Sequence, residues 1–536
     1  MTPGPEIAPI SSEPRDTSST SMDERRALQV VAPTHLQPAP SSAPNRMSAP
    51  SCERLASRLR AILGAEHVLT GSSARLSYSY DASPLEGLPD LVALPGSPEE
   101  VAAAIHLAMV EGAPVVARGS GTGLCGGAIP TRGGLVISTA RLNRIRLIDP
   151  INRRATVEPG VINLALSEAA KPYGLFYAPD PASQRISTIG GNVATNAGGP
   201  HCLAMGATAN HILAVQVALP DGKLIWLGDE HGTGGALGLD LLGAMIGSEG
   251  TLGVVTQIVT RLLPLPETVR TMLAIFPDIA TGSAAVSAII ADGIIPSALE
   301  MMDQLICQAV ERAFHAGYPD DAGSVLLIEV DGAREQVAAQ SERIAALCAA
   351  AGARETRVAR SAEERAALWA GRKGAAAALG QITTSYYLQD AVVPRSRLPI
   401  IMKRIEEISD EFSLLIPNVF HAGDGNLHPN MCFDRRKPGD IERVIRAGNE
   451  LLRACVDLGG VVSGEHGIGL EKRDALPYVY SARDLAAMAR LRLAFDPREL
   501  FNPDKIFPAD AACLEARAPY TVANATLRAG ENAWFC

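Results

Sequence analysis

The chain has 536 residues, of which 47% are hydrophobic and 20% charged, and its formal net charge is −10. This length predicts a globular protein of two or three domains. The sequence has no long basic block, which argues against nucleic-acid binding, and no apolar run of the ~18–20 residues that a membrane helix needs. It begins without a signal-peptide pattern. Nine scattered cysteines without a C-x-x-C pair argue against disulfides and a cysteine-ligated iron–sulfur cluster, and favour a reducing compartment.

The first half of the chain predicts a tail followed by an α+β domain. Residues 1–50 are rich in proline and serine and predict a disordered tail. A helix is expected from Cys52. Residues 89–123 follow as strand, helix, strand and glycine-rich turn, with Ser97 as N-cap and Pro98 at the first helical position. Residues 211–228 predict a hairpin closed by Asp221-Gly222, and a long strand follows from Gly250.

The second half predicts a separate domain and a return segment. A boundary is expected near residues 264–267, after which strands and helices alternate as in a small split β-α-β domain. Residues 361–380 and 441–460 predict helices, and 412–420 a strand. The expected organisation is a first domain over 51–267, a second over 268–480, a C-terminal segment over 481–510 and an uninformative tail over 511–536.

Three glycine-rich segments follow predicted strands or turns. They are "ARGSGTGLCGGA" from Ala117, "PDPASQRISTIGGNVATNAGG" from Pro179 and "GSEGTLGVVT" from Gly247. Glycines let backbone N–H groups approach a phosphate closely, although a plain turn-rich loop explains each segment alone. The first segment is not a Walker A loop, and it does not read as a G-x-G-x-x-G that opens a long helix.

Two later motifs concentrate histidine and glutamate. "NVFHAGDGNLHPN" places His421 and His428 around a glycine-rich turn, and "VSGEHGIGLEK" places Glu465 beside His466. Two imidazoles and a carboxylate are a set suited to Zn²⁺, Mn²⁺ or Fe²⁺. Histidines that merely pack around a turn explain the same spacing, so the residues alone leave both interpretations open.

Taken together in this order, the motifs resemble those of the FAD-linked oxidases of the vanillyl-alcohol-oxidase type. Within this family the chain looks like the glycolate oxidase FAD-linked subunit and the related D-lactate and D-2-hydroxyglutarate dehydrogenases, and the resemblance runs from about Arg54 to Pro508. The resemblance implies an α+β fold with a two-subdomain, PCMH-type FAD-binding domain, a ferredoxin-like cap domain and a short C-terminal helical segment. Thr122 stands near the place where covalent relatives carry histidine, so FAD is expected to be non-covalent.

The resemblance also implies roles for individual residues. Arg118, Gly119, Ser120, Gly121, Thr122 and Gly123 would wrap the FAD pyrophosphate. Pro179, Asp180, Ser183, Gly190, Gly191, Asn192, Thr195 and Asn196 would line the isoalloxazine and ribityl chain, and Glu249, Gly250, Gly253, Val254 and Val255 the adenosine side. His421, His428 and Glu465 would hold a divalent metal, zinc, manganese or iron. His466 would act as base, Asn426 would face the substrate, and Arg372 would bind its carboxylate.

The implied reaction is oxidation of a small D-2-hydroxy acid by hydride transfer to flavin N5. Ala376 and Leu388 stand where 2-hydroxyglutarate enzymes carry threonine and lysine, so a monocarboxylate is expected: glycolate first, with D-lactate as the alternative. Electrons would pass to quinone through a second FAD-binding subunit and an iron–sulfur subunit, with the chain cytoplasmic and at the membrane only through them. Two rivals are a metal-dependent hydrolase using His421, His428 and Glu465, and a non-catalytic FAD-binding scaffold.

Overall fold

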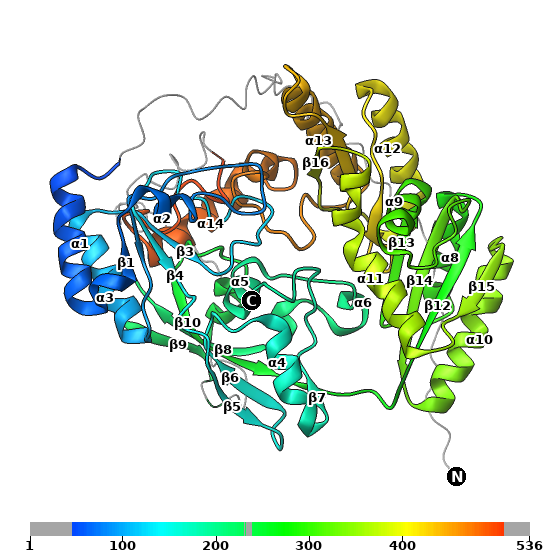
Figure 1. Ribbon diagram of the computed structural model, residues 1–536, viewed down its shortest axis with the longest axis horizontal. Helices are drawn as coiled ribbons and strands as arrows, with labels where there is room; N and C mark the ends of the chain where they lie inside the picture. Colours follow the sequence, from blue (N-terminus) through cyan, green and yellow to red (C-terminus); the bar gives the residue numbers. More distant parts are fainter. Residues whose placement is uncertain (1–45, 230, 232–237, 509–536) are drawn as a thin grey trace, which may run out of the picture. The chain divides into compact units, whose positions relative to one another are not determined.

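The computed structural model describes residues 46–229, 231 and 238–508 (Figure 1). The predicted tails over 1–50 and 511–536 therefore lie outside the described residues, except for residues 46–50. There the tail prediction is wrong at its end, because helix α1 (Ala49–Leu63) already begins at Ala49. The Ser48 side chain caps this helix by accepting the Ser51 N–H, and a proline occupies its first turn, where the missing N–H costs nothing.

The first half of the chain builds two main sheets with separate cores (Figure 1), besides the short pair of β7 (Leu175–Phe176) and β11 (Leu263–Pro264). The four-stranded sheet has the order β1-β2-β4-β3, with β1 Val68–Leu69, β2 Leu91–Ala93, β3 Val115–Arg118 and β4 Leu135–Ser138. The antiparallel five-stranded sheet has the order β5-β6-β10-β8-β9, with β5 Ile145–Asp149, β6 Arg154–Val157, β8 Ile212–Ala218, β9 Leu224–Gly228 and β10 Val254–Arg261.

Several sequence-based expectations for this half are confirmed. Helix α3 (Pro98–Glu111) begins after Ser97, whose side chain accepts the Glu100 N–H, and ends at a left-handed Gly112. Strands β8 and β9 form the expected hairpin, with Gly222 at φ +79° in its turn. The shorter elements of this half are α2 Ser72–Leu76, α4 Asn163–Ala170, β7 Leu175–Phe176, α5 Ile189–Thr195, α6 Cys202–Met205, α7 Leu241–Met245 and β11 Leu263–Pro264.

A seven-stranded sheet of order β15-β12-β14-β13-β18-β19-β17 organises the second half. Its strands are β12 Thr268–Phe276, β13 Ala298–Asp303, β14 Ser324–Gly332, β15 Glu355–Val358, β17 Ala391–Val392, β18 Val419–His421 and β19 Asn426–Leu427. The first four strands in chain order pair antiparallel in the order 4-1-3-2, which is the split β-α-β arrangement that the sequence predicted.

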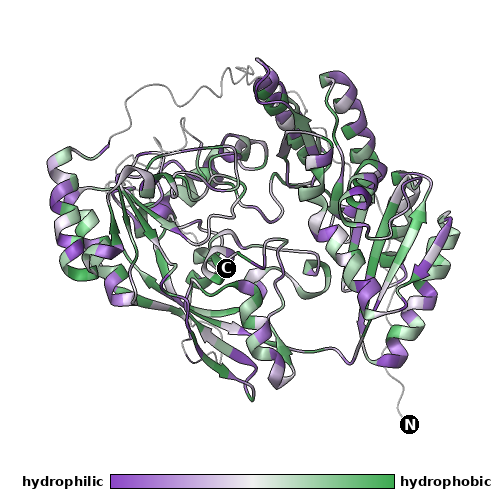
Figure 2. Ribbon diagram, viewed as in Figure 1, coloured by the Kyte–Doolittle hydropathy of each residue, from purple (hydrophilic) through white to green (hydrophobic). Residues whose placement is uncertain are grey.

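Helices cover both faces of this sheet (Figure 1). Successive side chains of β12 point to opposite faces, and those on each face pack against a different set of helices. Met272, Ala274 and Phe276 pack in one core with helices α8 (Ile279–Ala291), α10 (Arg334–Ala350) and α12 (Leu398–Phe412). Leu273 and Ile275 pack in the other with α9 (Gln304–Phe314) and α11 (Ala362–Ala378). A strand buried on both faces reads as a continuous apolar run, and Figure 2 shows these central strands as predominantly hydrophobic.

The remaining helices of this half largely match the sequence. Helix α11 forms as expected, with the Ser361 side chain as its cap, and α13 (Asp440–Asp457) covers most of the second predicted helix. The predicted strand over 412–420 is mostly wrong. Phe412 still belongs to α12, Ser413 ends that helix at φ +49°, and Pro417 precedes the short β18. Strands β16 (Ser385–Leu388) and β20 (Asn430–Phe433) form a separate pair.

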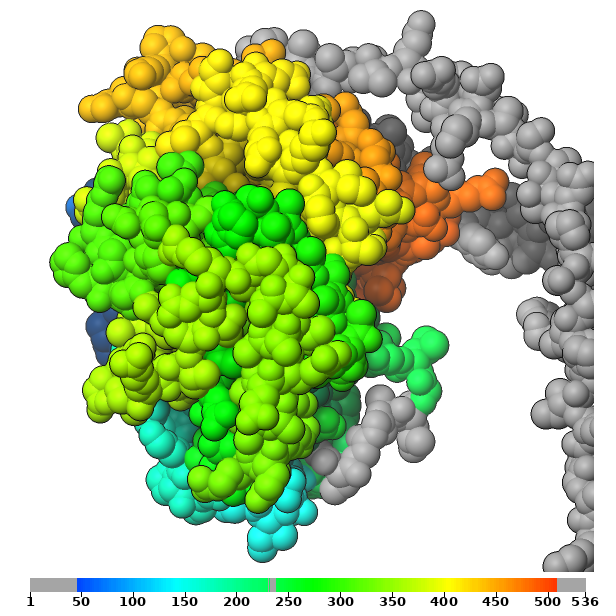
Figure 3. Space-filling view, turned by 90° about the vertical axis from the view of Figure 1, so that its right-hand side faces the viewer, coloured from blue at the N-terminus to red at the C-terminus, as the bar shows by residue number. Residues whose placement is uncertain are grey.

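The C-terminal segment returns to the first half of the chain. After helix α14 (Ala482–Phe495), Leu500 accepts the Val115 N–H at 2.8 Å, and the Asn502 N–H donates to the Val115 carbonyl at 2.7 Å. Phe501 is fully buried in the core beside the four-stranded sheet. In the side view of Figure 3, residues from the second half of the chain, green to orange, form most of the coloured surface.

The described residues bear on disulfide bonds and on membrane-spanning helices. Their seven cysteines are all free. None of their helices is both long and apolar enough to cross a lipid bilayer.

Candidate active site

The three glycine-rich segments of the first half come together in the structure. A Cβ on Gly119 would lie 2.3 Å from Oγ1 of Thr188, the N-cap residue of α5 in the second segment. The Glu249 N–H in the third segment donates to the Ala194 carbonyl in the second at 2.8 Å. Segments that are distant in the sequence therefore form one continuous surface, as a shared ligand would require.

The first of these segments offers unused hydrogen-bond donors. Within the described part of the chain, the backbone N–H groups from Ser120 to Gly123 donate no hydrogen bond, and Gly121 has φ +71°. Beneath the loop, the buried Arg118 side chain donates from Nη1 to the Tyr80 carbonyl at 2.7 Å. A row of free N–H groups on a glycine loop is a setting that suits a pyrophosphate. This segment therefore fits the FAD phosphates.

Several predicted FAD residues also hold the site together internally. The buried Asn163 side chain, which the motifs did not single out, donates to the Pro179 carbonyl at 2.9 Å and to Asn192 Oδ1 at 3.0 Å. Asn196 adopts φ +49° at the end of α5, and its Oδ1 accepts the Ala209 N–H at 2.8 Å. The three asparagine side chains thus shape the loop, whatever contact they make with a ligand.

Strand pairing brings the histidine motif beside a glutamate within the seven-stranded sheet, where β18 lies between β13 and β19. His421 in β18 lies opposite Glu300 in β13 and opposite Asn426 in β19. Between β18 and β19, Gly425 has φ +78°, and an added Cβ would meet the Val393 carbonyl at 2.1 Å. Only glycine fits this turn, so the sequence between the two histidines determines how they converge.

Both histidines point at one carboxylate oxygen. His421 Nε2 lies 3.1 Å and His428 Nε2 3.0 Å from Glu465 Oε1, and the three residues form a group able to hold a metal ion. Ligand atoms at about 2.0–2.2 Å from one cation lie roughly 3.0–3.5 Å from each other. The spacing therefore fits a divalent cation with little rearrangement.

Glu300 is a further residue of the candidate site, and the motifs did not reveal it. Its fully buried carboxylate lies 2.8 Å from His421 Nδ1 and 2.5 Å from Arg372 Nη2. Burial opposes its ionisation, but Arg372 and His421 outweigh that effect and hold the pKa of Glu300 below its ordinary value. A carboxylate on Nδ1 fixes the ring and leaves Nε2 for a metal. The predicted Arg372 lies next to the histidines, with Nη2 engaged by Glu300.

His466 stacks on His428, with ring centroids 5.0 Å apart and planes 11° from parallel. Its ring nitrogens make no hydrogen bond within the described residues, the nearest carboxylate oxygens being 3.9 Å away. Burial lowers its pKa to about 4; Asp390 opposes this shift, and His428 adds to it. A neutral imidazole with free nitrogens is able to accept a proton at neutral pH.

Asp390 anchors the segment that carries Glu465 and His466. Its Oδ2 accepts the Gly464 and His466 N–H groups at 3.0 Å and the Ser463 hydroxyl at 2.8 Å. The buried Lys472 ammonium donates to the same oxygen at 3.1 Å. Asp390, His428 and His466 form a second group of metal-ligating atoms, but this saturated carboxylate beside an ammonium disfavours a cation there.

Replacing Lys472 by methionine should destabilise the protein by about 3–5 kcal/mol, because the Asp390 carboxylate would remain buried without its cation. Chemical denaturation followed by circular dichroism measures this loss. Lys223→Met is the matched control: this lysine also pairs with an aspartate, Asp221, but is 76% exposed, so the unfolding midpoint should hardly move. Equal midpoints for the two variants would contradict the anchoring role of the Lys472–Asp390 pair.

The FAD segments and the histidine cluster meet at Gly198. A Cβ there would lie 2.6 Å from Glu465 Oε2 and 2.9 Å from Cys202 Sγ. Asn426, the other predicted catalytic residue, lies against Gly464, where a Cβ would come within 2.4 Å of its Oδ1. The structure thus brings the predicted proton acceptor, metal ligands and FAD loops into one region.

A charged network also joins the two halves of the chain beside this region. His201 lies 2.9 Å from Asp180 and 3.4 Å from Glu329, and it stacks on Trp369. Trp369 Nε1 donates to Glu329 at 2.7 Å, and Lys373 Nζ lies 3.4 Å from Asp180. Asp180 was predicted to line the flavin, whereas Glu329 has no motif that marks it.

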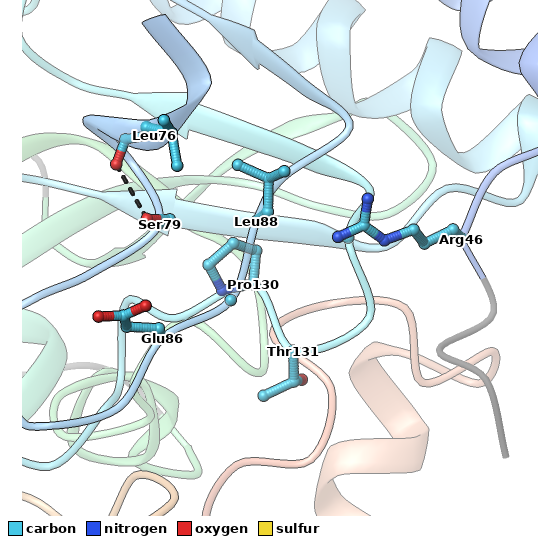
Figure 4. A pocket seen from close by; sticks show the side chains of 9 residues that line it. Arg46, Leu76, Ser79, Glu86, Leu88, Pro130 and Thr131 are labelled. Atoms are coloured by element: carbon cyan, nitrogen blue, oxygen red, sulfur yellow. Dashed lines mark hydrogen bonds between the residues drawn. The ribbon is translucent and has the colours of Figure 1, made fainter. Parts of the chain in front are cut away.

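A separate pocket of about 350 Å³ lies in the first half of the chain (Figure 4). Figure 4 shows the hydrogen bond from Ser79 Oγ to the Leu76 carbonyl on its wall. The lining consists of Arg46, Leu76, Ser79, Glu86, Gly87, Leu88, Pro130, Thr131 and Gly133. None of these residues belongs to the predicted site.

Comparisons with known proteins match nearly the whole described chain. The family model "FAD binding domain" matches residues 89–228, and "FAD linked oxidases, C-terminal domain" matches residues 265–506. The chain is 44% identical to "Glycolate oxidase subunit GlcD" of Escherichia coli K12, over 80% of this chain and 85% of the relative. It is 41% identical to the protein of the same name from Bacillus subtilis 168, over 84% and 96%. "D-lactate dehydrogenase" of Anaerostipes hadrus is 31% identical, over 82% and 94%.

Solved structures show the same fold at low sequence identity. p-Cresol methylhydroxylase superposes with a TM-score of 0.74 at 17% identity, covering 86% of this chain and 98% of that one. 4-Ethylphenol oxidase from Gulosibacter chungangensis superposes with a TM-score of 0.72 at 19% identity, covering 87% and 99%. The expected PCMH-type α+β architecture is therefore confirmed. The matches favour a flavin-dependent oxidoreductase over a metal-dependent hydrolase.

Proposed function

Since the chain belongs to the FAD-linked oxidases, a family of FAD-dependent oxidoreductases, we propose that it oxidises glycolate to glyoxylate, with D-lactate as the alternative substrate. The observation that carries the proposal is the contact between the FAD segments and the His421, His428 and Glu465 cluster at Gly198. The relatives named glycolate oxidase subunit and D-lactate dehydrogenase support the substrate class.

The oxidation removes two electrons and two protons from the hydroxy acid. FAD, when bound, accepts the hydride from C2. His466 is neutral and takes the hydroxyl proton on a ring nitrogen. His421, His428 and Glu465 would hold a divalent cation, which lowers the pKa of a coordinated hydroxyl.

Arg372 would bind the substrate carboxylate. Its Nη2 is paired with Glu300, whereas Nη1 has no hydrogen-bond partner within the described residues, so the carboxylate would bind at the remaining part of the guanidinium. Ala376 and Leu388 offer no charge for a second carboxylate. This combination favours a monocarboxylate over a dicarboxylate.

The word "subunit" in the relatives' names supports the proposal that this chain acts as part of a multi-subunit complex. A second FAD-binding subunit, an iron–sulfur subunit and membrane association through them remain predictions from the resemblance, as does the non-covalent attachment of FAD suggested by Thr122.

The test is anaerobic reduction of the FAD-loaded protein by glycolate, D-lactate or D-2-hydroxyglutarate in separate samples. We expect glycolate to bleach the visible flavin band, D-lactate to act more slowly and the dicarboxylate to have little effect. Prior treatment with a chelator should abolish bleaching. A yellow protein that none of the acids reduces would refute the substrate assignment, and bleaching that survives complete metal removal would refute the metal.

A further inference from the structure

The turn that follows His466 is bonded to the first half of the chain through a carboxylate. Glu249 Oε1 accepts the Ile468 N–H at 2.7 Å, and Glu249 Oε2 accepts the Gly469 N–H at 2.8 Å. The Leu470 N–H beside them donates to the Cys125 carbonyl at 2.8 Å. Both Glu249 and Cys125 belong to the glycine-rich segments predicted to bind FAD, so those segments hold the turn directly.

Glu249 is itself held rigidly. Its φ is +52°, a conformation that non-glycine residues seldom adopt. Its N–H donates to the Ala194 carbonyl, and its own carbonyl accepts from Asn502 Nδ2 at 2.6 Å. A strained residue fixed by two other segments persists only where the surroundings determine it. The carboxylate therefore presents a rigid double acceptor to the turn.

The fit between this carboxylate and the turn is close. Gly467 has φ +86°, and an added Cβ would lie 2.9 Å from Glu249 Oε1. On the other side of His466, Asp390 accepts the backbone N–H groups of Gly464 and His466. Two buried carboxylates, Glu249 from the first half of the chain and Asp390 from the second, thus accept hydrogen bonds from the backbone on either side of His466.

We propose that Glu249 is a positioning residue for His466 and Glu465, which acts by fastening their segment to the FAD-binding half of the chain. The carboxylate acts through the Ile468 and Gly469 backbone and not as a flavin contact. The inference rests on the proposed function, in which His466 accepts a proton and Glu465 binds a metal. Misplacement of a catalytic group by about 1 Å costs about 100-fold in rate. Loss of the hydrogen bonds from Ile468 and Gly469 to Glu249 should therefore slow flavin reduction measurably.

The experiment compares Glu249→Gln with the wild type, both full-length and loaded with FAD. At saturating glycolate we expect flavin reduction to slow about 10- to 100-fold, with KM changed by less than about twofold and the visible flavin spectrum unchanged. A chelator should strip the metal at least about tenfold faster, because Glu465 lies on the same segment. This second readout is metal content and needs no substrate.

Two further variants keep the result interpretable. Glu158→Gln removes another fully buried carboxylate of the same half, whose partners are Arg144 and Arg146, and should match the wild type in both readouts. Gly467→Ala keeps the Glu249 carboxylate but displaces the turn, and should reproduce the defect even if Glu249→Gln fails to fold.

The inference is overturned if Glu249→Gln or Gly467→Ala reduces flavin and retains metal like the wild type. It is also overturned if Glu249→Gln loses FAD while the rate per bound flavin stays normal, because Glu249 would then be a flavin ligand. If glycolate fails to reduce the wild type, the proposed function fails, and metal stripping still decides the role of Glu249.

Discussion

Flavin reduction by glycolate should slow by about 10²–10⁴-fold when His466 is replaced by alanine, the usual contribution of a positioned proton acceptor. The imidazole is neutral at neutral pH because burial lowers its pKa to about 4, and its nitrogens make no hydrogen bond within the described residues. Nearby groups offer no substitute, since Glu465 faces the histidine pair and Asp390 is saturated by backbone and Lys472 donors. Stopped-flow absorbance under anaerobic conditions measures the rate.

The variant should keep its FAD and its metal, because His466 is not one of the three proposed ligands. Added imidazole should restore part of the rate by occupying the space that the side chain leaves. His67→Ala is the control, since that side chain lies near the surface beside Glu66 and far in the sequence from the site motifs. Reduction of the His466→Ala flavin at the wild-type rate would show that the site is a binding scaffold without this base.

Replacing Glu465 by glutamine should weaken divalent-metal binding by more than about 100-fold, since residues that only orient a ligand already cost about 10- to 100-fold. Both histidine Nε2 atoms converge on its Oε1, so its loss removes the charge that balances the cation. Glu300→Gln should weaken metal binding only about 10- to 100-fold, because Glu300 contacts His421 through Nδ1 and would not bind the metal itself. Elemental analysis after dialysis against a graded chelator measures both affinities.

The order of the two effects is the informative result. A stronger metal loss in Glu300→Gln than in Glu465→Gln would contradict the proposal, because it would place the cation at His421 Nδ1, beside Glu300, and not at Nε2. Full metal content in Glu465→Gln would remove the carboxylate from the ligand set. Flavin reduction should fall in parallel with metal content in both variants.

The sequence contained enough to predict the fold class, and its motifs named most of the residues that the structure brings together in the candidate site. Glycine-rich loops and the histidine motifs are local signals, since they place special backbone conformations and ligating atoms within a few residues. The hairpin at Asp221-Gly222 and the helix after Ser97 follow from short-range rules of the same kind. These features appeared where the motifs placed them.

The partners of the site were not predictable, because they are ordinary residue types at large separations. Glu300 lies 121 residues from His421, and Glu249 lies 219 residues from Ile468. A glutamate in the middle of an apolar strand gives no spacing signal of its own, and only the pairing of β13 with β18 makes it a neighbour of the histidine. The strand expected over 412–420 failed because helix α12 extends to Phe412 in the same apolar stretch.

The return of the C-terminal segment has a consequence for biosynthesis. Val115 is bonded to Leu500 and Asn502, and Lys505 Nζ donates to the Ile129 carbonyl across 376 residues. A nascent chain emerges from its N-terminus and folds progressively, but this part of the first domain lacks its bridging residues Leu500 to Asn502 until they have left the ribosome. The edge of β3 at Val115 therefore stays unpaired until these late residues have been synthesised, and its closure depends on long-range contacts, which form more slowly than local ones.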